Sequence, residues 1–370
     1  MKYLIIAPRY HINLHDRILA LKNAGHFVDL IVQYKGKSEK YDLIDPEIIG
    51  YSRVYLFFEK IFSKFKKTYL KNSWELKLSL PPLRKFKKRI KEINPDVIMV
   101  KGLKSLFSLC ALKYAKRFKI KSIVFIQRDR FRCQRLKEKF VCWFLFKHYQ
   151  VKAVASPICR KSGRDEKSHE KFHYIPFVYD IVDFEKSYFK NVKMNILNIG
   201  KFEPIKDQLT LLKAVEKLKS FYPMKIVLVG EKADPNYILK LMDFVKENKM
   251  EDIVEFKFDA PHAEVIELYR QSDLFVLTSL SDPASFQILE AMANKVPVIS
   301  SDKNGTKCYI KEGETGYIFK AGDADDLARK IESVIDDKDD VINFGRAGFE
   351  QAKKNHSLEK FSQKIKAILS

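Results

Sequence analysis

The chain has 370 residues, of which 46% are hydrophobic, and it contains 13 glycines and 13 prolines. This composition excludes disordered, collagen-like and linker-rich proteins. The length is about twice that of a typical single domain, so two globular domains of similar size are expected. Five cysteines without a C-x-x-C pair indicate neither a disulfide framework nor a zinc site, and a cytoplasmic protein is expected.

The net charge of +22 is confined to one half of the chain. Residues 1–200 carry 43 Lys and Arg against 18 Asp and Glu, whereas residues 201–370 carry 26 against 29. This uneven distribution predicts an anionic partner for the N-terminal half. Apolar runs such as residues 140–146 are far shorter than the roughly 20 residues that cross a bilayer, so no membrane span is predicted.

Short runs rich in Ile, Val and Phe alternate with longer segments of helical periodicity, which is typical of parallel sheets with crossover helices. The predicted strands form two series, 3–7, 28–33, 96–100, 122–126 and 153–156, then 195–200, 225–230, 253–256, 273–279 and 297–301. Periodicity is lost between the series, after Pro176. The sequence therefore predicts an α/β protein with two Rossmann-like domains facing across a cleft. Their bounds are 1–182 and 183–352, with a C-terminal helix in 353–370 that packs back on the first domain.

Residues 59–92 contain twelve Lys or Arg and three acids, with aromatic and aliphatic residues at helical spacing. Basic amphipathic helices of this kind are typical of anionic membrane surfaces, and a peripheral membrane protein is expected. A core-facing apolar stripe with a solvated basic side is the alternative interpretation. A nucleic-acid-binding surface is a third, but no RNP-type motif, zinc finger or helix-turn-helix accompanies it, so no nucleic-acid partner is expected.

Two carboxylates stand out in "SDPASFQILEAMANKVPVISS", residues 281–301. Asp282 precedes Pro283, a pattern that predicts a helix start, and Glu290 follows eight residues later. Eight helical residues turn about 80° beyond two full turns and rise about 12 Å, so the two acids would not share one metal but could contact both ends of an elongated ligand. A helix cap plus a surface acid is the alternative.

Neither a P-loop nor G-x-G-x-x-G occurs, so a Walker-type nucleotidase and a dinucleotide enzyme are not supported.

The arrangement S-x-x-(acid)-x7-E-A-M-A-x-x-x-P-V-I resembles the signature of retaining, GT-B fold glycosyltransferases of family 4. Further segments are similar to that family in the same order, namely "NILNIGKFEPIKDQLTLLKAVEKL", "KIVLVGE", "YRQSDLFVLTS" and "KEGETGYIF". The N-terminal half matches only in outline. The resemblance implies a GT-B fold and retaining, metal-independent transfer of a hexose-type sugar from a nucleoside diphosphate to a glycan. It also implies a lipid-linked acceptor at the cytoplasmic face of a membrane, and no cofactor beyond the donor substrate.

The resemblance also assigns roles to individual residues. Lys201 and Lys206 would hold the donor diphosphate in place of a metal ion, Glu290 the ribose and Asp282 the donor sugar. Gly200, in the loop of the two lysines, is a further candidate, and backbone N–H groups of Ser285, Phe286 and Gln287 at the predicted helix start could face the diphosphate. Arg9, His11 and Asn13 lie just past the first predicted strand, where they could contact donor or acceptor.

The sequence departs from the family pattern at several points. The first acid is Asp rather than Glu, "PAS" replaces G-x-G beside it, and "PRYHINLHD" replaces a Gly-rich first loop. Because of these departures, the sequence does not identify the donor sugar. A non-catalytic homologue that binds a nucleotide sugar is therefore an alternative.

Overall fold

The structure, a computed structural model, describes residues 1–10, 12–34, 42–63, 79–102, 105–126, 140, 143–156, 172–189 and 193–370, without the side chains of 12, 13, 59 and 61–63. Its described part divides into two compact units. Unit 1 comprises the described residues within 1–156, 172–178 and 358–370, and unit 2 comprises those within 179–357. Each unit is a Rossmann-like α/β domain built on a parallel sheet, so the predicted fold class is confirmed.

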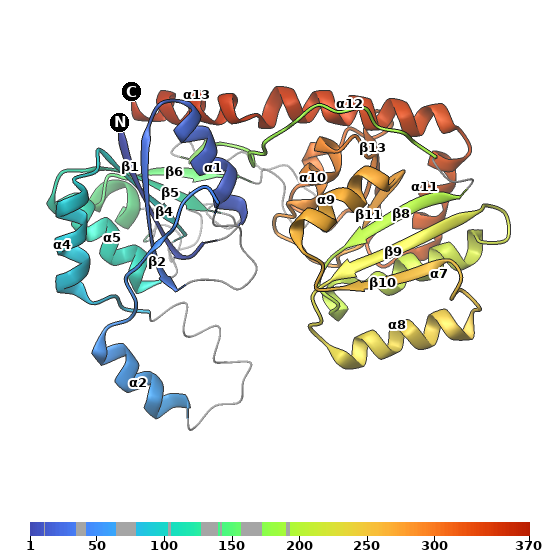
Figure 1. Ribbon diagram of the computed structural model, residues 1–370, viewed down its shortest axis with the longest axis horizontal. Helices are drawn as coiled ribbons and strands as arrows, with labels where there is room; N and C mark the ends of the chain where they lie inside the picture. The colour runs from blue at the N-terminus through green and yellow to red at the C-terminus, as the bar shows by residue number, and fades with distance from the viewer. Residues whose placement is uncertain are drawn as a thin grey trace. The chain divides into compact units, whose positions relative to one another are not determined.

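Unit 1 has a parallel sheet with the strand order β3-β2-β1-β4-β5-β6-β7 (Figure 1). The strands are β1 (Lys2–Arg9), β2 (Phe27–Tyr34), β3 (Glu47–Ile48), β4 (Val97–Lys101), β5 (Lys121–Ile126), β6 (Lys152–Ala155) and β7 (Phe172–Tyr174). The helices are α1 (Ile12–Asn23), α2 (Arg53–Ser63), α4 (Leu83–Ile93), α5 (Leu106–Arg117) and α13 (Leu358–Leu369), with a π-helical turn at Trp143–His148. The five strands predicted in this half are confirmed to within two residues, whereas the short β3 and β7 were not predicted.

Helices cover both faces of the unit 1 sheet, because successive residues of a strand point to opposite sides. Tyr3 and Ile5 of β1 pack in one core cluster with α1 and with Phe361 of α13, whereas Leu4 and Ile6 pack in another with α4 and α5. Helix α13 lies beside α1 although the two are far apart in the sequence (Figure 1). The last helix of the chain is therefore part of the core of unit 1.

The apolar side of α4 belongs to this core. Phe86, Ile90 and Ile93 are buried against the sheet and α5, while lysines of the same helix such as Lys88 are exposed. The expectation that this part of residues 59–92 lies on a membrane through its apolar side is therefore wrong, and the alternative of a core-facing stripe with a solvated basic side is right. Residues 64–78 of the same segment lie outside the described part of the chain.

Unit 2 has a parallel sheet with the order β10-β9-β8-β11-β12-β13. The strands are β8 (Met194–Ile199), β9 (Met224–Gly230), β10 (Val254–Phe258), β11 (Leu274–Leu277), β12 (Val298–Ser301) and β13 (Gly316–Phe319). The helices are α7 (Gln208–Leu218), α8 (Pro235–Glu247), α9 (His262–Gln271), α10 (Gln287–Ala293), α11 (Ala324–Ile335) and α12 (Lys338–His356), with 3-10 turns at Pro204–Lys206 and Lys307–Tyr309.

The strand order of unit 2 reverses between β8 and β11, which pair directly. In open α/β sheets, ligands bind outside the C-terminal ends of the strands at such a switch point. The loop after β8 carries Lys206, and the loop after β11 carries Asp282. The topology therefore brings together two segments that are about 75 residues apart in the chain. Among the helices of the described residues, none is long and apolar enough to span a membrane.

Candidate functional site

Hydrogen bonds tie the loop after β8 to the loop after β11. The buried Asn198 side chain of β8 donates to the Val276 carbonyl of β11 at 2.8 Å. Further along, the Thr278 hydroxyl donates to the Lys206 carbonyl at 2.7 Å, and the Leu280 N–H donates to the Ile205 carbonyl at 2.9 Å. The backbone of Lys206 is thus fixed by the neighbouring loop, and its side chain is presented at the C-terminal edge of the sheet.

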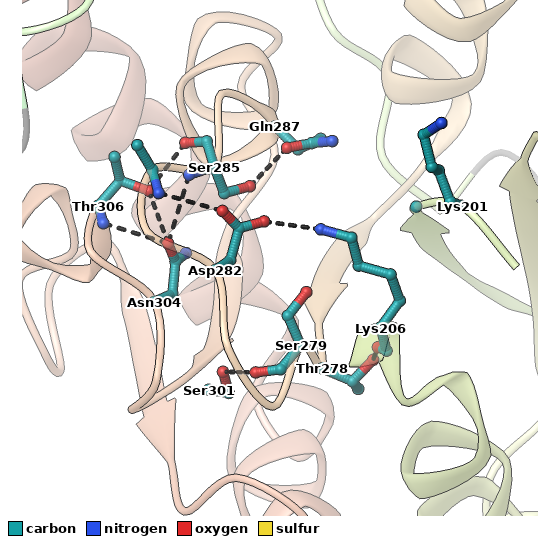
Figure 2. Close-up of polar contacts among 12 residues, drawn as sticks. Lys201, Lys206, Thr278, Ser279, Asp282, Ser285, Gln287, Ser301, Asn304 and Thr306 are labelled. Carbon is teal, nitrogen blue, oxygen red and sulfur yellow. Dashed lines mark hydrogen bonds and ion pairs between the residues drawn. The ribbon is translucent and has the colours of Figure 1, made fainter. Parts of the chain in front are cut away.

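Lys206 and Asp282 form an ion pair at this edge, with Nζ 2.8 Å from Oδ2 (Figure 2). Their side chains are only 19% and 12% exposed, so the pair is largely screened from bulk water. The other carboxylate oxygen of Asp282 accepts the Ala284 N–H at 3.0 Å. This side chain closes a local turn and at the same time binds the lysine.

The predicted helix start at Pro283 is wrong. Helix α10 begins at Gln287, and its N-cap residue Phe286 provides no side-chain cap. Asp282 instead forms an isolated bridge with Asn304, its N–H donating to the Lys303 carbonyl at 3.1 Å. Pairing with the loop after β12 therefore holds the Asp282 backbone extended, and the helix starts four residues later than the sequence signal indicated.

The loop after β12 supports the Asp282 turn through two buried residues that the sequence reasoning missed. The Asn304 carboxamide oxygen accepts the Ser285 N–H at 3.5 Å and the Thr306 N–H at 3.1 Å, and the Thr306 hydroxyl donates to the Ser285 carbonyl at 2.8 Å (Figure 2). One of the backbone N–H groups predicted to face a diphosphate, that of Ser285, thus points to Asn304. Nothing local in "DKNGTK" marks the contacts with Ser285, because that residue lies about twenty residues away in the chain.

The residues that open α10 are packed among side chains of unit 2. The Ser285 hydroxyl donates to the Gln287 side-chain oxygen, and the ring of Phe286 lies 5.8 Å from that of Tyr179, centroid to centroid. Phe286 is buried and Gln287 is partly buried. The predicted site residues Ser285, Phe286 and Gln287 thus lie where the chain passes from the Asp282 turn into α10.

Glu290 lies in the first turn of α10 and is buried. One carboxylate oxygen is 3.2 Å from His262 Nε2, and the other accepts the Tyr269 hydroxyl at 3.3 Å. Tyr269 is fully buried, and this burial, reinforced by the charge of Glu290, raises the pKa of the Tyr269 phenol well above its usual value. The phenol therefore stays protonated and acts as a donor. Sequence reasoning missed both partners, because they lie 28 and 21 residues before Glu290 in the chain.

Lys201 is placed differently from Lys206. Its ammonium group pairs with Glu231 at 2.5 Å, both side chains are more than half exposed, and Figure 2 shows it pointing away from the Lys206–Asp282 pair. Gly200, which precedes it, lies where the β8 loop passes Gly230 at the end of β9. The two predicted diphosphate lysines thus lie on one loop, one in a partly buried pair and one at the surface.

The site residues predicted in the N-terminal half belong to unit 1. Arg9 is the exposed last residue of β1. Asn13 lies in the first turn of α1, with its side chain outside the described part, and His11 lies outside it altogether. Their predicted role near donor or acceptor stays a prediction.

The two parallel α/β units, with the polar loops of unit 2 at its switch point, define a protein of the GT-B fold. Two solved structures share this fold over the whole chain. The glycosyltransferase from Rickettsia africae has a TM-score of 0.76 at 18% identity, with coverage of 100% of this chain and 99% of the other. Anabaena HepE, in complex with UDP and glucose, has a TM-score of 0.73 at 15% identity with the same coverage.

The family model "Glycosyl transferases group 1" matches residues 181–351, so the resemblance seen in the sequence is confirmed for this part of the chain. The chain is 29% identical over 193 residues to N-acetyl-alpha-D-glucosaminyl L-malate synthase of Bacillus anthracis, covering 52% of this chain and 49% of the relative. It is 27% identical over 143 residues to the lipopolysaccharide core biosynthesis glycosyltransferase LpsE of Rhizobium meliloti, covering 38% and 39%. The matched segments thus span about half or less of these relatives.

Proposed function

We propose that this protein is a retaining glycosyltransferase that moves a hexose-type sugar from a nucleoside diphosphate to a glycan acceptor without a metal ion. The observation that carries the proposal is the Lys206–Asp282 pair at the switch point of the unit 2 sheet, with Glu290 beyond it on α10. Lys206, Asp282 and Glu290 all lie within the segment that the family model matches. The lysine would suit the diphosphate of such a donor, and the two acids would suit its sugar and its ribose.

Lys206 would stabilise the leaving diphosphate. An ammonium group has three N–H donors. Lys206 Nζ donates one of them to Asp282, so the other two can bind phosphate oxygens. A cation fixed in advance at a largely screened site stabilises the charge that develops on the leaving group more than a mobile cation in water would. Lys201, exposed on the same loop, would add a second positive charge, and the two lysines would take the place of a metal ion.

Asp282 would bind hydroxyl groups of the donor sugar. Its carboxylate offers about four lone-pair sites, of which the Ala284 N–H and Lys206 Nζ occupy two. The solved HepE complex contains UDP and glucose, which makes UDP-glucose the first donor to test. LpsE acts in lipopolysaccharide core biosynthesis, which supports a glycan acceptor that is lipid-linked.

A thermal-shift screen against UDP-, GDP- and ADP-sugars, followed by a turnover assay, tests the proposal. A ligand at 100 times its dissociation constant adds about 2.7 kcal/mol of stability. Lys206→Ala should lower turnover by about 10²- to 10³-fold, the usual cost of removing one donor to a developing negative charge. Glu290→Gln should abolish or strongly weaken donor binding, because the charged acceptor for the ribose is lost. Lys217→Ala, at an exposed lysine of α7, is the matched control.

The outcome that refutes the site assignment is turnover at the wild-type rate in both Lys206→Ala and Glu290→Gln. The non-catalytic alternative has its own signature, since such a homologue would be stabilised by a nucleotide sugar yet neither transfer nor hydrolyse it. The short Asp282 side chain, held by two partners, is the observation that favours it. Nucleic-acid binding with a steep salt dependence and no response to nucleotide sugars would identify a nucleic-acid-binding protein instead.

We also propose that unit 1 contacts an anionic membrane surface through α2. Val54, Leu56, Phe57 and Phe58 are exposed on this helix, together with Arg53. Exposed apolar side chains beside basic ones suit partial insertion into anionic lipid, to which each basic residue adds about 1 kcal/mol.

Cosedimentation with phosphatidylglycerol and phosphatidylcholine vesicles tests the membrane contact. The wild-type protein should bind the anionic vesicles in preference, and the double change Phe57→Ser and Phe58→Ser should lower that binding several-fold. The control, Lys88→Ala on α4, should have a smaller effect because it removes charge without apolar area. Equal binding of the double variant and the wild type would contradict this use of α2.

A further inference from the structure

Helix α9 presents two side chains to Glu290 from a single face. His262 and Tyr269 are seven residues apart, and seven helical residues turn about 700°, only about 20° short of two full turns. His262 Nε2 lies 3.2 Å from Glu290 Oε1, and the Tyr269 hydroxyl lies 3.3 Å from Oε2. The two oxygens of one carboxylate are thus held separately, from positions about 10 Å apart along one helix.

These contacts fix the carboxylate without saturating it. An ionised carboxylate has about four lone-pair sites, and His262 and Tyr269 occupy one on each oxygen. One site per oxygen is left, which matches the two donors of a ribose diol. Tyr269 shares its hydroxyl with the Gln287 carbonyl at 3.3 Å, so α9 is tied to the start of α10 as well as to Glu290.

The two partners differ in their surroundings. Tyr269 is fully buried, whereas the His262 side chain is 29% exposed, so His262 forms the solvent-facing side of the cluster. For Nε2 to donate to Glu290, His262 must carry a proton there, in the Nε2–H tautomer or as the imidazolium. An unpartnered Glu290 would be free to change rotamer and to rotate its carboxylate.

We propose that His262 and Tyr269 are positioning residues that orient Glu290 toward both hydroxyl groups of a ribose, so that the site selects ribonucleoside over 2′-deoxyribonucleoside diphosphates. This inference rests on the proposed function, in which Glu290 binds the ribose of the donor. It extends that function by naming the groups that make Glu290 selective for the diol.

Calorimetric titration of the full chain with UDP, GDP and ADP, each beside its 2′-deoxy form, tests the inference. The wild-type protein should bind the ribonucleotide of its preferred base more tightly than the deoxy form. His262→Ala should weaken ribonucleotide binding about 5- to 30-fold, as expected for a misaligned charge-assisted hydrogen bond. It should weaken deoxynucleotide binding less, because the deoxy form has only its 3′-hydroxyl to lose from Glu290. His262→Gln, whose amide can still donate, should restore most of the difference. Tyr269→Phe should resemble His262→Ala.

Glu267→Ala, at an exposed position of α9, is the matched control and should leave both affinities unchanged. Thermal melting of each variant shows whether it is folded. Equal weakening of ribo- and deoxynucleotide binding by His262→Ala, or no weakening of either, would overturn the inference. If Glu290→Ala binds the ribonucleotide as tightly as the wild type, the proposed function itself fails and the inference fails with it. Loss of binding in Glu290→Ala without an effect of His262→Ala and Tyr269→Phe refutes the inference alone.

Discussion

Replacing Gly230 by alanine tests how closely the end of β9 must approach the loop after β8, which carries Lys201 and Lys206. A Cβ at Gly230 would lie 1.9 Å from the Gly200 carbonyl oxygen and 2.8 Å from its carbon, distances that real Cβ atoms do not reach. Both atoms belong to the backbone, so no side chain can move aside. The Gly200 N–H donates to the Val229 carbonyl at 2.9 Å, and the Gln208 amide donates to the carbonyls of Gly200 and Lys201, so the loop is held on several sides.

Overpacking usually costs about 1–3 kcal/mol, and a clash with fixed backbone belongs at the upper end of that range. We therefore expect Gly230→Ala to lower the free energy of unfolding by about 3 kcal/mol, which lowers Tm by roughly 6–12 °C in a domain of this size. Because the displaced loop carries Lys201 and Lys206, nucleotide-sugar binding should weaken as well. Thermal melting with and without UDP-glucose measures both effects.

Gly200→Ala is the matched control. Its Cβ would meet Lys206 Cγ at 3.5 Å, an ordinary van der Waals contact, so the cost should stay below about 1 kcal/mol. A wild-type Tm in Gly230→Ala, or an equal loss in both variants, would refute the argument from close approach.

Two further predictions concern unit 1. Phe86→Ala removes a fully buried ring of α4 and should lower the free energy of unfolding, measured by urea denaturation, by about 3–5 kcal/mol. Lys88→Ala, on the exposed side of the same helix, should lower it by less than about 0.5 kcal/mol. Similar losses in the two variants would contradict the burial of the Phe86 side of α4. The hydrogen bond to Asp16 raises the pKa of His15 in the folded protein. The charged imidazole therefore stabilises the fold fully at pH values below the unfolded pKa of about 6.5. This stabilisation is lost as the pH rises through the higher folded pKa. His15→Gln should therefore destabilise the protein more at pH 5.5 than at pH 9, and an equal effect at both pH values would count against this pairing.

Most of the sheet framework could be predicted from the sequence because buried parallel strands appear as short apolar runs whatever surrounds them. The run "KIVLVG" predicted residues 225–230, and β9 spans Met224–Gly230. The short strands β3 and β7 have only two or three residues, too few for a periodic signal.

The parts of the site that sequence could not predict depend on contacts between distant segments. Asp-Pro is a sound signal for a helix start, but pairing of Asp282 with Asn304 overrides it. His262 and Tyr269 become functional candidates only when α9 is seen against Glu290, which lies 28 and 21 residues further along. The same limit applies to α4, since an apolar stripe beside lysines suits a membrane or a protein core equally well until its neighbours are known.

The placement of α13 has a consequence for biosynthesis. The core of unit 1 includes Phe361 and Ile365, although nearly all of its other residues precede residue 179. Domains generally fold in the order in which the ribosome delivers them, at about 5–20 residues per second. Here the unit that is translated first must wait for the last thirteen residues, Leu358–Ser370, before its core can close. Unit 2 can complete its own core earlier, so the nascent chain is expected to mature from its second half toward its first.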